Sequence, residues 1–143
     1  MRVLVLLAML FAGAQTAAAQ GLIGMEKTIL PTIKQSWIAF RNYDGRQYVY
    51  FTMLVTYRCG LKAVRFGVNG GPMEEEFPLP PCDRDNPNAI DVEKYPPYIT
   101  MPPGAADTMG VQIIYSDGEK SEVVVFRPCA GGAEDQTCAA LVD

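Results

Sequence analysis

Four cysteines constrain this 143-residue chain more than any other feature. They are Cys59, Cys82, Cys129 and Cys138, with 22, 46 and 8 residues between successive members. Structural zinc sites use close cysteine pairs of the C-x2–4-C type, and redox pairs use C-x-x-C. Neither spacing occurs here, so the pattern favours disulfides over a zinc site or free thiols. Of the three connectivities we favour Cys59–Cys82 with Cys129–Cys138, each stabilising the fold by about 3 kcal/mol.

The N-terminus has the pattern of a secretory signal peptide over residues 1–19. Arg2 precedes an apolar stretch from Val3 to Ala14, and Ala17 to Ala19 provides the small residues of a signal-peptidase site. The apolar stretch is about a dozen residues, whereas a spanning helix needs about twenty. We therefore expect cleavage near Ala19, export to a bacterial periplasm or the exterior, and no permanent membrane anchor. Such compartments are oxidising, as disulfides require.

Composition excludes several functions. The chain contains no histidine, which excludes Ser-His-Asp and Cys-His catalysis and any zinc site that uses histidine. Removal of residues 1–19 leaves 11 basic and 16 acidic residues, a net charge of about −5, which argues against a nucleic-acid partner. We assign no catalytic residue, cofactor or metal ligand, and we expect the protein not to be an enzyme.

Short alternating segments bounded by turns predict a β-protein. We expect strands over residues 32–40, 48–59, 61–68, 73–79, 99–101, 111–115 and 122–126. The segment 48–59 carries apolar side chains at both parities, which predicts a central strand. Six to seven strands in about 100 residues are typical of an Ig-like β-sandwich, and a small barrel is the alternative. We expect one all-β domain over 20–128 and a tail over 129–143 that is loosely ordered apart from its disulfide.

Two segments carry a resemblance to known modules. Val64 to Gly71 reads "VRFGVNGG", and Val111 to Ser121 reads "VQIIYSDGEKS". Together they resemble immunoglobulin and fibronectin-III-like sandwich modules of the kind appended to chitobiase and β-hexosaminidase enzymes. The resemblance implies a sandwich fold and an accessory or binding role, and it implies no catalytic residues.

Two kinds of residue are candidates for a binding surface. Tyr95 and Tyr98 flank two prolines in a rigid stretch and could stack on sugars or hold a partner, or else cap the core. The remaining candidates lie in predicted turns, where binding residues of sandwiches gather; they are Asn42, Asp44, Arg46 and Asn69.

Two further sites are weaker. The segment from Asp83 to Glu93 is rich in oxygen ligands suited to calcium, but it lacks EF-hand spacing, so a solvated loop with Asx turns is the simpler interpretation. Paired carboxylates could support glycoside hydrolysis, but the sequence places no two of them together. We therefore expect an exported, disulfide-linked protein that binds an envelope protein or a glycan. The alternatives are a histidine-free hydrolase acting on glycans and a purely structural envelope protein.

Overall fold

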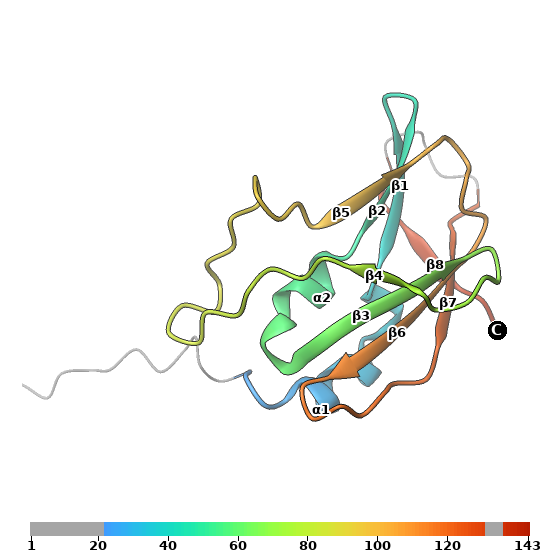
Figure 1. Cartoon of the computed structure of the whole chain (residues 1–143). Helices are drawn as coiled ribbons and strands as arrows, with labels where there is room; N and C mark the ends of the chain where they lie inside the picture. Colours follow the sequence, from blue (N-terminus) through green and yellow to red (C-terminus); the bar gives the residue numbers. More distant parts are fainter. Residues whose placement is uncertain (1–21, 131–135) are drawn as a thin grey trace, which may run out of the picture.

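The computed structural model describes residues 22–130 and 136–143, so the expected signal peptide over 1–19 lies outside the described residues. Strands dominate the described chain, with two short helices and two single 3-10 turns (Figure 1). In chain order the elements are α1 (Glu26–Thr32), η1 (Lys34–Ser36), β1 (Ala39–Tyr43), β2 (Arg46–Tyr50), α2 (Thr52–Thr56), η2 (Arg58–Gly60), β3 (Leu61–Val68), β4 (Glu75–Phe77), β5 (Tyr98–Met101), β6 (Met109–Tyr115), β7 (Val124–Pro128) and β8 (Ala139–Leu141). Within the described parts of the chain, none of the helices has the length and hydrophobicity that a membrane span requires.

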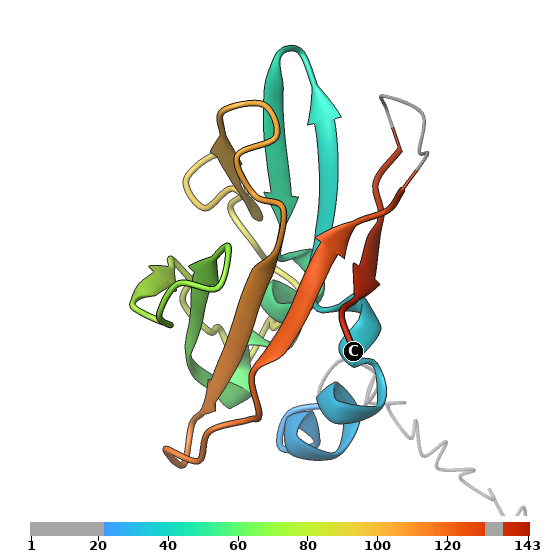
Figure 2. The same ribbon diagram turned by 90° about the vertical axis from the view of Figure 1, so that its right-hand side faces the viewer.

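The strands form two antiparallel sheets. One has the order β1-β2-β5 and the other β4-β3-β6-β7-β8. Figure 2 shows the five-stranded sheet lying in front of the three-stranded sheet, with the helices toward the end opposite the β1–β2 turn. A bridge between Phe40 of β1 and Cys138, which directly precedes β8, joins the two sheets along one side. The expectation of a mostly β fold is thereby confirmed.

The turn between β1 and β2 follows from its sequence. Asp44 and Gly45 have φ values of 50° and 68°, the left-handed conformations that a two-residue type I′ hairpin turn requires. The register runs from Tyr43 opposite Arg46 to Ala39 opposite Tyr50. This hairpin projects from the body of the molecule (Figure 1).

The core lies between the sheets and extends beneath α2. Phe51 is fully buried, and its ring stacks on Phe77 at a centroid distance of 4.3 Å and contacts Phe66 at 5.7 Å. Trp37 is also buried, and its Nε1 donates a hydrogen bond to the Leu30 carbonyl at 2.9 Å. Apolar side chains from both sheets and both helices thus form one cluster.

The predicted strand over 48–59 is wrong beyond Tyr50. β2 ends there, and α2 and η2 follow. The buried residues of this segment are Phe51, Leu54, Val55 and Arg58, the spacing of one helical face. Val, Thr and Tyr favour strands in isolation, but burial of this face beneath the sheets overrides that preference.

Two other segments also differ from the prediction. Residues 32–38 of the expected first strand form the end of α1, η1 and a short connection, so β1 begins only at Ala39. In the tail, β8 pairs with β7, so Ala139–Leu141 belongs to the sheet rather than to a loose segment. Residues 131–135 of that tail lie outside the described residues. The predicted edge position of the 73–79 segment is confirmed, because β4 is the outermost strand beside β3.

Gln47 fixes β2 against the loop between β5 and β6. Its side chain is buried, its Nε2 donates to the Ala106 carbonyl at 3.0 Å, and its Oε1 accepts from the Ala106 N–H at 2.8 Å. Gln47→Leu would leave both buried backbone groups unpaired, so we expect it to lower the free energy of unfolding by about 2 kcal/mol. Urea denaturation measures the change. Gln35→Leu, at an exposed position, is the control, and equal stability of the two variants would contradict this role.

Candidate functional site

Three tyrosines cluster on the outer face of the three-stranded sheet. Tyr48 and Tyr50 alternate along β2 with the buried Gln47 and Val49, and Tyr98 lies opposite Tyr50 on β5. The ring of Tyr98 meets those of Tyr48 and Tyr50 edge to face, with centroids 5.3 and 5.5 Å away. All three side chains are half-buried, so the cluster presents aromatic surface to the outside.

Arg41 lies beside this cluster on β1. It is opposite Tyr48 in the sheet, and its guanidinium lies over the ring of Tyr43 at 4.5 Å from the centroid. The Arg41 Nε atom is buried, and no described residue accepts a hydrogen bond from it. A buried donor without an acceptor is costly, and the charge of this guanidinium is not neutralised by an acidic side chain of the described residues.

A groove of about 460 Å³ lies at the foot of this face, between η1, β1 and α2. Arg41 and Tyr50 line it together with several hydroxyl side chains. The described lining residues are Ser36, Trp37, Ile38, Ala39, Arg41, Tyr50, Thr52, Met53, Thr56 and Thr137. None of them is acidic, so the groove combines an apolar floor, hydroxyl groups and one cationic side chain. Together, the tyrosine cluster, Arg41 and this groove are called the tyrosine–arginine face below.

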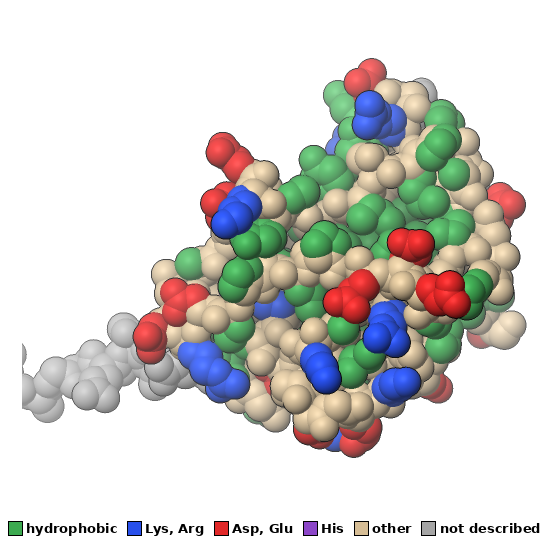
Figure 3. Space-filling model, in the orientation of Figure 1, with side chains coloured by type: hydrophobic (Ala, Val, Ile, Leu, Met, Phe, Trp, Pro, Cys, Tyr) green, Lys and Arg blue, Asp and Glu red, His purple; other side chains and the backbone are tan. Residues whose placement is uncertain are grey.

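The loop over residues 82–97 leads into β5 and is held at both ends. At its start, the Cys59–Cys82 disulfide ties it to η2, with the two Cα atoms 4.9 Å apart. At its end, the Phe51 N–H donates to the Pro97 carbonyl at 2.7 Å, which extends the β2–β5 pairing. In the space-filling view, the outline of the molecule is notched between this loop and the β1–β2 hairpin (Figure 3). The position of Tyr98 therefore depends on this anchored loop.

Arg58 is the buried centre of that anchorage. Its side chain is 2 % exposed and donates hydrogen bonds only to backbone carbonyls among the described residues. Nε donates to Pro81 at 3.0 Å, Nη1 to Val55 at 3.3 Å and to Pro87 at 2.9 Å. Nη2 donates to Ala89 at 3.1 Å. Burial lowers the pKa of the Arg58 guanidinium, while the charge of nearby Asp83 opposes this shift.

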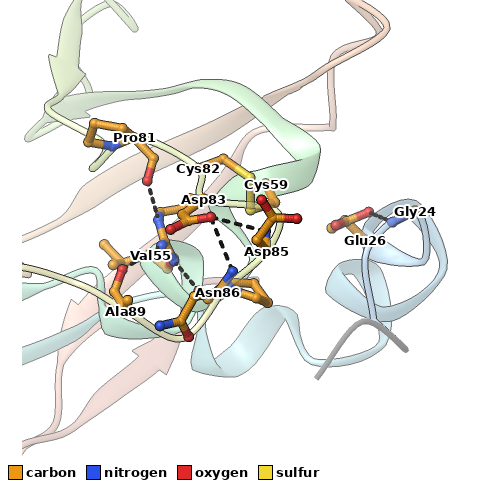
Figure 4. Close-up of a disulfide and its surroundings, with 12 residues drawn as sticks. Gly24, Glu26, Val55, Cys59, Pro81, Cys82, Asp83, Asp85, Asn86 and Ala89 are labelled. Carbon is orange, nitrogen blue, oxygen red and sulfur yellow. Dashed lines mark hydrogen bonds between the residues drawn. A yellow bond between two sulfur atoms is a disulfide. The ribbon is translucent and has the colours of Figure 1, made fainter. Parts of the chain in front are cut away.

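The acidic loop from Asp83 to Glu93 forms Asx turns, as the simpler interpretation predicted. Asp83 Oδ1 accepts hydrogen bonds from the N–H groups of Asp85 and Asn86 at 3.0 and 3.1 Å (Figure 4). Asp91 Oδ1 accepts one from the Lys94 N–H at 3.1 Å. These carboxylates thus order the loop backbone, and in residues 22–130 and 136–143 no three acidic or cysteine side chains lie close enough to hold a metal ion.

The predicted disulfide pairing is confirmed. Cys59 bonds to Cys82 and Cys129 to Cys138, with Cα–Cα distances of 4.9 and 5.7 Å. The first disulfide closes the loop that contains β3 and β4, and the second lies beside the junction of the two sheets. Both are therefore parts of the scaffold around the tyrosine–arginine face.

Two of the predicted binding residues lie on the same side of the three-stranded sheet as the tyrosine–arginine face. Tyr98 belongs to the tyrosine cluster, and Arg46 lies at the tip of the hairpin, opposite Tyr43. Asp44 is in the turn itself, and Asn42 pairs with the inward-facing Gln47.

The other two predicted residues lie elsewhere. The ring of Tyr95 is in the loop before β5, where Lys94 Nζ lies 5.3 Å from its centroid. Asn69 connects the β3–β4 turn to the loop before β6. Its amide donates to the Ala105 carbonyl at 2.9 Å and accepts from the N–H groups of Asp107 and Thr108 at 2.8 and 3.1 Å.

Sequence analysis missed Tyr48, Tyr50 and Arg41. The signal that could have found them is parity: Arg41 and Tyr43 alternate with the buried Phe40, as Tyr48 and Tyr50 do with Gln47 and Val49. The prediction of one long central strand obscured this pattern, because it required both of its faces to be buried.

A second hollow, of about 340 Å³, lies between α1 and the β6–β7 turn. Most of its charged groups have partners: Lys27 Nζ contacts Asp117 at 2.8 Å and also bonds to Glu119, and Lys34 Nζ contacts Glu122 at 3.2 Å. The hydrogen bonds of Lys27 raise the pKa of Lys27, and the one to Asp117 lowers the pKa of Asp117. Burial raises the pKa of Tyr115 beside them. Unlike Arg41, Lys27 and Lys34 already have acidic partners, so this hollow is the weaker candidate.

Comparison of the chain with protein-family models, with curated proteins and with solved structures found no match.

Proposed function

We propose that this protein is an exported, non-catalytic glycan-binding protein whose binding surface is the tyrosine–arginine face. The observation that carries the proposal is the tyrosine cluster beside a groove lined with hydroxyl side chains. Aromatic rings offer flat apolar area to the C–H faces of sugar rings, and hydroxyl groups exchange hydrogen bonds with sugar hydroxyls. The signal-peptide pattern and the two disulfides support export to a bacterial envelope, where glycans are abundant partners.

We also propose an Ig-like sandwich as the fold. In the constant-type Ig domain, strands A, B, E and D form one sheet and C, F and G the other. By chain order β1, β2 and β5 take the places of A, B and E, and β3, β6 and β7 take those of C, F and G. β4 joins the edge beside β3 instead of the first sheet, and β8 is an addition. This strand order supports the resemblance noted in the sequence.

The absence of acidic side chains from the described lining of the groove favours binding over hydrolysis. Glycoside hydrolysis by paired carboxylates needs an acid and a second carboxylate on either side of the scissile bond. β1, β2 and β5 also contribute no acidic residue. The proposed role is therefore to hold a glycan rather than to cleave it.

The test is retention of the purified mature protein on a panel of immobilised neutral and acidic glycans. Tyr48→Ala removes a ring from the centre of the cluster, and we expect it to weaken retention about tenfold, the loss typical of an aromatic contact residue. Tyr95→Ala is the matched control, because Tyr95 is half-buried like Tyr48 but lies outside the cluster. Circular dichroism verifies that both variants fold.

Two results would contradict the proposal. One is the failure of the wild-type protein to bind any member of the panel. The other is equal retention of the wild-type protein and Tyr48→Ala, which would place the binding surface elsewhere. Turnover of a chromogenic glycoside by the wild-type protein would overturn the non-catalytic part.

A further inference from the structure

We propose that the tyrosine–arginine face selects glycans that carry carboxylates, such as polymers of uronic acids, and that Arg41 binds the carboxylate. This inference rests on the proposed glycan-binding function and specifies its ligand class. It requires a cationic group at the groove, an environment of matching charge, and room for a sugar ring beside the guanidinium. The described residues meet each requirement.

Arg41 is the cationic group. Its ion pairs to acidic side chains are absent among the described residues, where the paired cations are Lys27, Lys34 and Arg65. Its Nε also lacks an acceptor, although the atom is buried. A carboxylate accepts two parallel hydrogen bonds from the two Nη atoms of a guanidinium, and neither Nη atom of Arg41 has a hydrogen-bond partner among the described residues. A ligand carboxylate would thus provide the acidic partner that Arg41 lacks among the described residues.

The ring of Tyr43 restrains the Arg41 guanidinium. The guanidinium lies 4.5 Å from the centroid of this ring, and Tyr48 lies opposite Arg41 on the neighbouring strand. An arginine that is already ordered loses little side-chain entropy when it binds, which favours affinity. The restrained guanidinium of Arg41 is therefore suited to bind a planar carboxylate.

The charge of the face is opposite to that of the whole chain. The net charge of the chain is −4, but the strands β1, β2 and β5 contain two arginines, Arg41 and Arg46, and no acidic residue. An acidic polymer is repelled by most of such a protein and attracted to this face, which gives orientation as well as affinity.

The groove provides the space next to Arg41. Its volume of about 460 Å³ is in the usual range for small-molecule sites, and Tyr50 and Arg41 line it together. A pyranose ring stacked on Tyr50 would have its carboxylate within the reach of Arg41 and its hydroxyl groups near Ser36, Thr52 and Thr56. The cluster with Tyr48 and Tyr98 extends the same surface for a neighbouring sugar.

The experiment is calorimetric titration with oligosaccharides prepared from polygalacturonate, alginate and hyaluronan. Each is compared with the same oligosaccharide after reduction of its carboxyl groups to alcohols. We expect the wild-type protein to bind at least one acidic form and to lose about tenfold or more in affinity for its reduced form. Arg41→Gln should lose the same factor for the acidic form and should no longer distinguish the two forms.

Arg84→Gln is the control, because it makes the same change in net charge at an exposed position in the loop over 82–97, away from the groove. We expect it to bind as the wild-type protein does. Equal affinity of the wild-type protein for acidic and reduced forms would overturn the inference and leave glycan binding standing. An effect of Arg84→Gln as large as that of Arg41→Gln would also overturn it. Binding of neither form of any oligosaccharide would overturn the inference together with the proposed function.

Discussion

Arg58→Met is expected to lower the free energy of unfolding by about 4 kcal/mol, because four backbone carbonyls would lose their donor at about 1 kcal/mol each. The methionine fills much of the same volume but offers no hydrogen-bond donor. A typical domain is stable by only about 5–15 kcal/mol, so this change would be a large share of the total. Urea denaturation followed by circular dichroism measures it.

Two variants make this result specific. Arg84→Met removes an exposed arginine from the same loop and is expected to change stability by less than about 0.5 kcal/mol. Arg58→Lys keeps the charge but replaces a planar fork by a single ammonium, so it should recover only part of the loss. If Arg58→Met were as stable as Arg84→Met, the role of Arg58 as the anchor of the loop would be wrong.

The double variant Cys59→Ser/Cys82→Ser is expected to lower stability by about 3 kcal/mol in the loop-entropy model. The disulfide closes a segment with a sequence separation of 23, and it fixes the start of the same loop that Arg58 holds. The loop leads to Tyr98, so we also expect weaker glycan retention of this variant below its unfolding transition. Thermal unfolding and the glycan panel measure the two effects.

Loss of the disulfide and loss of Arg58 should not be additive. Both act on the segment from Pro81 to Ala89, and residues that share partners couple in double-mutant cycles. Once one anchor is removed, the other holds a segment that is already loosened, so the combined loss should be smaller than the sum. Strict additivity would show that the two anchors act on separate parts of the fold. Cys129→Ser/Cys138→Ser, combined with Arg58→Met, is the matched control and should be additive.

Prediction from the sequence was most accurate where a short segment determines its own structure and no distant contact overrides it. The Asp44-Gly45 turn demands left-handed backbone that few other residues adopt, and the structure has it. The cysteine spacing similarly favoured the pairing that the structure contains. The predicted strand over 61–68 coincides with β3.

The sequence failed where packing over distance decides the local structure. Thr52, Val55 and Thr56 favour strands. In the structure Leu54 and Val55 instead form the buried face of a helix, next to Phe51. β8 pairs with β7 across the ten residues 129–138. β8 itself has only three residues, too few to show the alternation that predicts a strand. Neither result follows from a window of neighbouring residues.

The candidate site was predicted only in part for the same reason. Tyr98 was chosen from the sequence as an aromatic candidate, but its neighbours Tyr48 and Tyr50 come from a strand about 50 residues earlier. Only the pairing of β2 with β5 makes the three rings a cluster. The groove likewise needs α2, which was not predicted.

The alternation along β2 has a consequence for how such a protein can diversify. Gln47 and Val49 face the interior, whereas Tyr48 and Tyr50 face outward. Successive residues of this strand therefore contribute in turn to the core and to the outer surface. Substitutions at the outward positions leave the interior packing unchanged, because side chains on opposite faces of a strand do not touch. The outer surface of this strand can therefore change one residue at a time while the scaffold beneath it stays the same.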